Sequence, residues 1–219
     1  RTIGNHVFTP DGRMGGRCWD GTVSVLTAYN HRVFAPTLED DHNYILAGHI
    51  GQICSLIEKN DLKDVILAGH SYGGMIITGV AARMAERISH LVYVDAALPD
   101  PGQSLYDILH LCLSGPVGSR PFLPEPAAPY VEKLQFDPVK IKSLPKTYIL
   151  CTKSDFIDVT RIARQKIDAA QEGWTCLELP SSHVPMADMP DEFYKLMLDV
   201  AEKQVVNKPL LSSIKAGTT

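Results

Sequence analysis

The sequence predicts an α/β domain in which helices flank both faces of a mainly parallel β-sheet. Short apolar runs alternate with segments of helical periodicity along most of the chain, which is the pattern of βαβ units. The runs at 64–68 and 90–94 are largely apolar, as strands buried on both faces of a parallel sheet are. The chain has 219 residues, of which 45% are hydrophobic and 21% charged, so we expect one globular domain spanning 1–219.

The first half of the chain divides into strands and helices at clear breaks. Pro10 and Pro36 each end a short β-prone run, and Gly12, Gly15 and Gly16 form a turn after the first strand. Apolar residues recur at helical spacing between 41 and 59. In order, the elements expected here are a strand at 6–8, a helix at 19–29, a strand at 32–35, a helix at about 41–59, a strand at 64–68 and a helix at 73–84.

The second half repeats the alternation but contains one irregular stretch. From about 99 to 145 the chain is rich in Pro and Gly and carries one short helical piece at 105–113. A long insertion inside a compact domain is usually functional, so we expect a small cap over the sheet. The polar tail at 207–219 is expected to be loosely held. The other elements expected are strands at 90–94, 147–151 and 175–179 and a helix from about Asp191.

Charge and cysteine content exclude several classes of protein. Lys plus Arg is 21 and Asp plus Glu is 25, so no basic excess is present to neutralise a nucleic acid backbone. No apolar run approaches the roughly 20 residues of a membrane span, and the first residues lack a signal peptide's apolar core. The five cysteines are scattered without zinc-binding spacing. We expect a cytoplasmic protein without metal, membrane or nucleic acid partner.

A nucleophile elbow follows the strand at 64–68. The strand runs directly into Gly69-His70-Ser71-Tyr72-Gly73, and a helix of small residues comes next. The pattern Gly-x-Ser-x-Gly, in the order strand, sharp turn and helix, raises a serine hydroxyl above the sheet. The sequence therefore predicts that Ser71 is a nucleophile; the alternative is a tight turn without chemistry.

A serine nucleophile needs a base, and His183 has the right position for one. It follows the last expected strand, where parallel sheets place their sites. The other histidines lack such a position and are expected at the surface or in packing, with His70 supporting the elbow. The alternative for His183 is a loop histidine bonded to backbone.

Four segments together resemble a known superfamily. They are GHSYGGM at 69–75, HLVYVDAALP at 90–99, YILCT at 148–152 and SHVPM at 182–186. On these, residues 7–203 resemble the α/β-hydrolase superfamily, most closely the small bacterial serine hydrolases related to plant methyl-ester esterases and hydroxynitrile lyases. The resemblance implies a Ser-acid-His triad and no cofactor.

The resemblance also implies an oxyanion hole made of two backbone N–H groups. One belongs to Tyr72, the residue after the nucleophile. The family usually has His-Gly or Pro-Gly and then a small residue after the first strand. Here those positions are Pro10, Asp11 and Gly12, so the second N–H is expected from Gly12.

The acid of the triad has two candidate positions. The plant esterases carry it two residues after the Cys-Thr pair, where this chain has Ser154, with Asp155 beside it. The fold also allows an acid at the end of the strand that follows the nucleophile helix. In this chain that strand is expected at 90–94, and Asp95 comes directly after it. A carboxylate at the end of a fully buried strand is costly unless it serves a partner. We favour Asp95 as the partner of His183, with Asp155 as the alternative.

The expected function is hydrolysis of a small, apolar carboxylic ester, thioester or lactone by a monomer or homodimer. In the cap, four apolar residues are expected to line the substrate pocket, unless they only pack the cap against the sheet. They are Leu105, Leu109, Phe122 and Tyr130.

Two other functions are compatible with this fold. A ligand-binding protein with little or no turnover is the main alternative, since fold does not imply function. A hydroxynitrile lyase of this branch carries a lysine after the histidine and a threonine in the oxyanion loop. This chain has Val184 and Gly12 at those positions, which disfavours a lyase.

Overall fold

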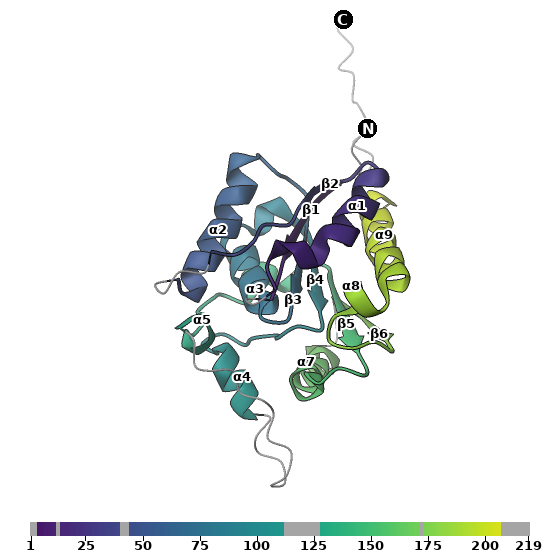
Figure 1. The fold of residues 1–219 in the computed structure, drawn as a ribbon. Coiled ribbons are helices and arrows are strands. Elements are labelled where there is room, and N and C mark those ends of the chain that lie inside the picture. Colours follow the sequence, from purple (N-terminus) through teal and green to yellow (C-terminus); the bar gives the residue numbers. More distant parts are fainter. Residues whose placement is uncertain (1–3, 12–13, 40–43, 112–127, 171–172, 207–219) are drawn as a thin grey trace, which may run out of the picture.

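A six-stranded, wholly parallel sheet forms the centre of the computed structural model, which describes residues 4–11, 14–39, 44–111, 128–170 and 173–206. The strand order is β2-β1-β3-β4-β5-β6, and Figure 1 shows the strands running through the middle of the molecule. The prediction of a parallel α/β sheet is confirmed. The strands are β1 (Asn5–Thr9), β2 (Arg32–Phe34), β3 (Val65–His70), β4 (Ile88–Val94), β5 (Lys146–Cys151) and β6 (Trp174–Leu179).

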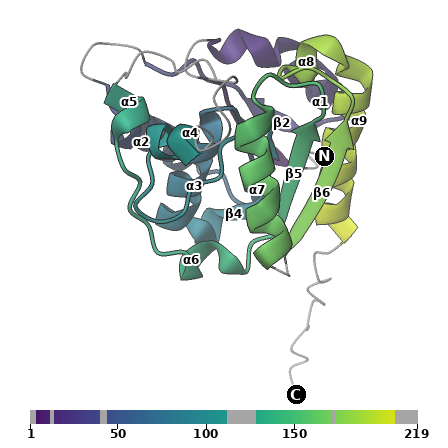
Figure 2. The same cartoon turned by 90° about the horizontal axis from the view of Figure 1, so that it is seen from below.

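Helices cover both faces of the sheet (Figures 1 and 2). One face packs against α2, α3 and α7, and the opposite face packs against α1 and α9. The described helices are η1 (Gly16–Trp19), α1 (Asp20–Ala28), α2 (Leu46–Lys59), α3 (Gly73–Arg83), η2 (Ala85–Arg87), α4 (Leu105–Leu111), α5 (Ala128–Val131), α6 (Val139–Lys142), α7 (Ile157–Ala170), α8 (Pro185–Asp188) and α9 (Pro190–Val206).

Strand β3 shows why the central strands are apolar throughout. Val65 and Leu67 belong to the core formed with α2, α3 and α7, whereas Ile66 and Ala68 belong to the core formed with α1 and α9. Because successive side chains point to opposite faces, a strand between two helical layers must be apolar at every position. This burial holds β3 in place, and with it the serine that follows.

One helix prediction needs correction, and one long helix was missed. The helix expected from about 41 begins only at Leu46, because Ile45 has an extended backbone with φ −116° and ψ 172°. Helix α7 was not predicted at all. It buries Val159, Ala163 and Ile167, which recur every four residues. The polar residues between them make this apolar face too narrow to recognise from the sequence pattern.

The stretch predicted as a cap contains three short helices within its described part. Helices α4 and α5 contact each other, α5 also contacts α2, and α6 packs against α3. The two arms of the insertion run antiparallel, since Gly102 N–H donates to Leu134 C=O and Leu134 N–H donates to Gln103 C=O. Residue Phe122 and the tail at 207–219 lie outside the described residues.

None of the helices in the described ranges is long and apolar enough to cross a membrane.

Two histidines are buried in the sheet away from its carboxyl ends. His90, in β4, has a nitrogen 2.8 Å from the Thr147 hydroxyl, and His6, in β1, has one 3.1 Å from His31. Burial lowers the pKa of His90 to about 4, with a smaller effect of Lys203 and Lys146. Burial, and next His31, lowers the pKa of His6 to about 3. Both imidazoles are therefore neutral in the folded protein at neutral pH.

We expect opposite effects on stability from two Gly→Ala changes in helices. At Gly74 in α3, a Cβ would overlap the carbonyl oxygen of Ala97, whereas at Gly51 in α2 it meets nothing within 4 Å. Gly74→Ala should lower the free energy of unfolding by several kcal/mol, as overpacking does. Gly51→Ala should raise it by about 0.5–1 kcal/mol, because alanine favours the helix. Denaturant unfolding measures both, and equal effects would contradict the close approach at Gly74.

We expect the free energy of unfolding to fall as the pH drops from 6.5 toward 4. In this range the unfolded chain protonates His90 and the folded chain does not, so the proton stabilises the unfolded state. For His90 the loss is about 3 kcal/mol at most. The variant His90→Gln should show a shallower fall in urea unfolding at several pH values. The exposed His110 supplies the control, and His110→Gln should keep the wild-type slope.

Candidate active site

The nucleophile elbow has the strained backbone that its sequence predicts. Ser71 lies between β3 and α3 with φ 56°, a left-handed conformation that residues other than glycine rarely adopt. Backbone hydrogen bonds hold it there: Ser71 N–H donates to Val94 C=O, and Ser71 C=O accepts from Gly74 and Ala97 N–H. A Cβ at Gly69 would lie 2.5 Å from the Gly73 carbonyl oxygen, so the turn needs glycine there.

A buried carboxylate lies beside the elbow, at the carboxyl end of β4. Asp95 is 0% exposed and has φ 43°, and its own N–H donates to Ile149 C=O. Its Oδ1 accepts from Cys151 N–H at 2.9 Å, and its Oδ2 accepts from His183 Nδ1–H at 2.7 Å. Both oxygens are thus bonded, which is the condition for keeping a carboxylate in the interior.

The structure brings Asp95, and not Asp155, to His183. Asp155 is exposed in the turn after β5, and among the described residues no hydrogen bond joins it to His183. The neighbouring Ser154 is buried, and its hydroxyl accepts from Phe156 N–H at 3.0 Å just before α7. The position where the plant esterases carry their acid therefore serves the start of a helix here.

His183 lies in the loop between β6 and α8, and its ring contacts two other aromatic rings. Its ring centroid is 4.8 Å from that of Phe156 and 4.6 Å from that of His70, and its side chain is 18% exposed. Because Nδ1–H is bonded to Asp95, Nε2 carries the lone pair that a base requires. No hydrogen bond joins it to the Ser71 hydroxyl among the described residues, and such bonds often tighten only once substrate binds.

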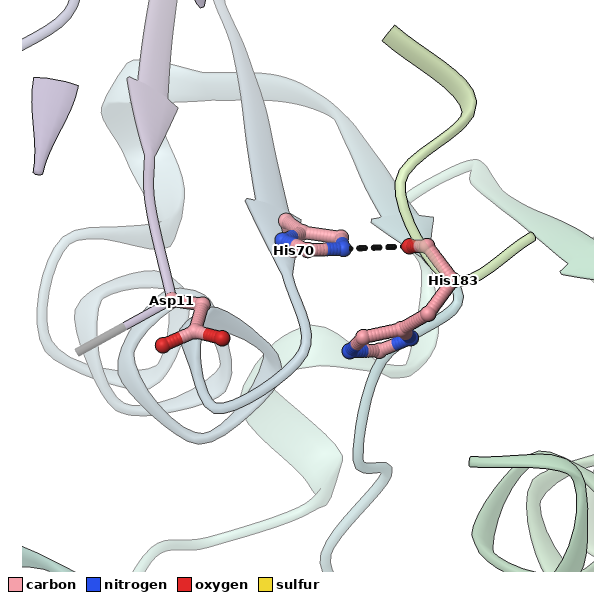
Figure 3. A group of neighbouring side chains, drawn as sticks. All are labelled: Asp11, His70 and His183. Carbon is pink, nitrogen blue, oxygen red and sulfur yellow. Dashed lines mark hydrogen bonds between the residues drawn. The ribbon is translucent and has the colours of Figure 1, made fainter. Parts of the chain in front are cut away.

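His70 ties the elbow to the His183 loop, which extends the supporting role expected for it. Its Nε2–H donates to the His183 carbonyl oxygen at 2.6 Å (Figure 3). The carbonyl can only accept, so the proton of the neutral ring is on Nε2. Burial, and next the nearby His183, lowers the pKa of His70 to about 4. His70 is therefore uncharged, and its side chain links the elbow to the loop that carries His183.

Tyr72 is anchored by its side chain, so its backbone has a fixed place at the start of α3. Its hydroxyl lies 3.0 Å from His49 Nδ1, and His49 Nε2 lies 2.9 Å from the Glu39 carbonyl oxygen. The carbonyl accepts from Nε2–H, so Nδ1 accepts from the phenol. The Tyr72 ring also contacts Tyr130 edge-on at 5.1 Å between centroids. His49, expected at the surface or in packing, thus supports the elbow; its helix-face position gave no sign of this partner.

The remaining predicted site residues have mixed positions. Gly12 and Phe122 lie outside the described residues. Leu105 and Leu109 of α4 are 4% and 3% exposed and belong to the core beside the sheet. Tyr130 is half-buried against Tyr72. Pocket lining by these residues stays a prediction.

The comparisons with known proteins agree with this fold. A family model described as the alpha/beta hydrolase family matches residues 7–196. Over 235 aligned positions the chain is 30% identical to a carbendazim hydrolyzing esterase of Nocardioides sp. (strain SG-4G), covering 87% of this chain and 96% of that protein. The chain belongs to the alpha/beta hydrolase family.

Two further proteins place this alpha/beta hydrolase among its relatives. The Arabidopsis thaliana protein named "Putative methylesterase 11, chloroplastic" is 30% identical over 117 residues, which cover 49% of this chain and 30% of that protein. An extracellular α/β-hydrolase from a Paenibacillus species shares the fold, with a TM-score of 0.72 and 24% identity over 89% of this chain and 98% of that chain. The predicted resemblance is confirmed, and the chain is an enzyme of the hydrolase class, of carboxylesterase type.

Proposed function

We propose that this hydrolase cleaves a small carboxylic ester, thioester or lactone through Ser71, His183 and Asp95. The observation that carries the proposal is the 2.7 Å hydrogen bond from His183 to a fully buried Asp95, beside a serine held in a strained elbow. A base oriented by a carboxylate next to a raised hydroxyl is the arrangement that activates serine. The relative named for hydrolysing carbendazim supports the esterase class.

In the first half of the reaction, Ser71 Oγ attacks the carbonyl carbon while its proton passes to His183 Nε2. The carbonyl π electrons move onto oxygen, and the N–H groups of Tyr72 and Gly12 are the proposed donors to this oxyanion. When the intermediate collapses, the bond to the leaving group breaks and the leaving oxygen or sulfur takes the proton from Nε2. An acyl ester on Ser71 remains, and the acid, base and serine regain their starting charges.

In the second half, water repeats these steps. It loses a proton to His183 Nε2 as its oxygen bonds to the acyl carbon, and the new intermediate releases Ser71, which recovers the proton. In both halves His183 is transiently an imidazolium. Asp95 stabilises that charge and keeps Nδ1 protonated, because its Oδ2 accepts from His183 Nδ1–H while its Oδ1 accepts from Cys151 N–H.

We expect a fluorophosphonate probe to attach once to the wild-type protein and not to Ser71→Ala. Such probes react with serines whose hydroxyl is activated by a neighbouring base. Intact-mass analysis measures the adduct. Ser55→Ala, which changes an exposed serine of α2, is the matched control and should label like the wild type. A fully folded wild-type protein that takes up no probe would contradict an activated Ser71.

We expect Asp95→Asn to lower kcat/KM for an activated ester by about 10⁴-fold, because the amide favours the wrong histidine tautomer. The matched change Asp155→Asn, in an exposed turn, should leave kcat/KM within about twofold, as surface changes do. Steady-state assays on nitrophenyl esters, with carbendazim in the wider screen, give both values. A large loss in Asp155→Asn with activity kept in Asp95→Asn would reverse the assignment of the acid.

A further inference from the structure

Three potential metal ligands converge at the carboxyl ends of β1, β3 and β6. Asp11 follows β1, His70 ends β3 and His183 follows β6, and Figure 3 shows their side chains grouped around a common space. One ligand atom from each residue lies within 4.8 Å of those of the other two. The proposed mechanism uses only His183 of these three as a chemical group.

His70 points to a ligand that the described residues do not supply. Its Nε2–H is bonded to the His183 carbonyl, so its Nδ1 holds a lone pair. That Nδ1 is buried without a hydrogen-bond partner, on a side chain that is 0% exposed. In Figure 3 this nitrogen lies on the side of Asp11. A buried acceptor without a donor is unfavourable, and binding a cation there would offset that cost.

His183 presents a second lone pair in the same way. Its Nδ1–H is bonded to Asp95, which leaves Nε2 as the free coordination atom. Metal-binding histidines almost always give their other N–H to a carboxylate or a backbone carbonyl, which fixes the ring. His183 has the carboxylate and His70 has the carbonyl. Both rings are therefore held as metal ligands usually are.

We propose that Asp11, His70 and His183 form a binding site for a divalent transition metal ion such as Zn²⁺, and that the ion inhibits the enzyme. Two imidazoles and one carboxylate suit zinc, with a water in the fourth position. Ligands of tetrahedral zinc lie about 3.3–3.6 Å apart, so the three groups must approach by about an ångström. Asp11 and His183 come from loops, which absorb such a shift more easily than His70 in β3.

We expect inhibition because the ion would occupy the nitrogen of His183 that acts as the base. Zinc on His183 Nε2 takes the lone pair that must accept the proton of Ser71. Metal binding itself does not depend on the proposed hydrolysis, but the inhibition does. No zinc-binding spacing is visible along the chain because the three ligands come from separate segments, at positions 11, 70 and 183. The expectation of a metal-free protein relied on local spacing and did not test this set.

The test is a titration of the chelator-treated full chain with Zn²⁺ by calorimetry, and with Co²⁺ by its visible absorption. We expect one ion per chain and a tetrahedral cobalt spectrum. Asp11→Asn and His183→Gln should each weaken binding at least tenfold, since loss of even an outer-shell partner costs 10–100-fold in affinity. Asp20→Asn removes the same charge from an exposed position nearby in the chain and should bind like the wild type.

The outcomes separate this proposal from the proposed function. If millimolar Zn²⁺ does not bind to the wild type, or binds to Asp11→Asn and His183→Gln as tightly as to the wild type, the metal site is wrong. If zinc binds as expected but the protein neither hydrolyses esters nor labels with fluorophosphonate, the site stands and the function fails. In an active enzyme, Zn²⁺ should block fluorophosphonate labelling of Ser71, and a chelator should restore it. Should Asp11→Asn not fold, as judged by circular dichroism, His183→Gln decides.

Discussion

The hydrogen bond between Asp95 and His183 is the interaction on which the rest of the site depends. It joins a fully buried carboxylate at the end of β4 to a loop that follows β6. Removing either partner would leave a buried polar group unpaired, and a buried charge without a partner is among the largest single costs in a protein interior. Folding therefore selects the same contact that the proposed chemistry uses, and the second oxygen of Asp95, bonded to Cys151 N–H, fixes the carboxylate plane.

Much of this arrangement was predictable from local sequence. The elbow around Ser71 can be predicted because a strand, a glycine-flanked serine and a small-residue helix occur together. Asp95 could be favoured over Asp155 on physical grounds, since a carboxylate after a buried strand needs a partner. The position of His183 after the last strand followed from the topology of parallel sheets.

The contacts between side chains from distant loops could not be predicted from the sequence. Nothing local indicates that His49 bonds the Tyr72 phenol, or that Asp11 lies with His70 and His183, because both depend on how separate strand ends align. Helix α7 was not predicted because its apolar face is narrow and lies among polar residues; it consists of Val159, Ala163 and Ile167. The late start of α2 reflects an extended Ile45, which periodicity counted as helical.

The spacing of the site along the chain has a consequence for folding. Asp95 and His183 are 88 positions apart, and His70 bonds a carbonyl 113 positions away. Each partner lies at or after the end of a different strand, so both contacts depend on the alignment of β3 and β4 with β6 through β5. Contacts between such distant positions close late and carry a large loop-closure entropy. The site is thus a long-range property of the fold, and it requires that the ends of β3, β4 and β6 be aligned.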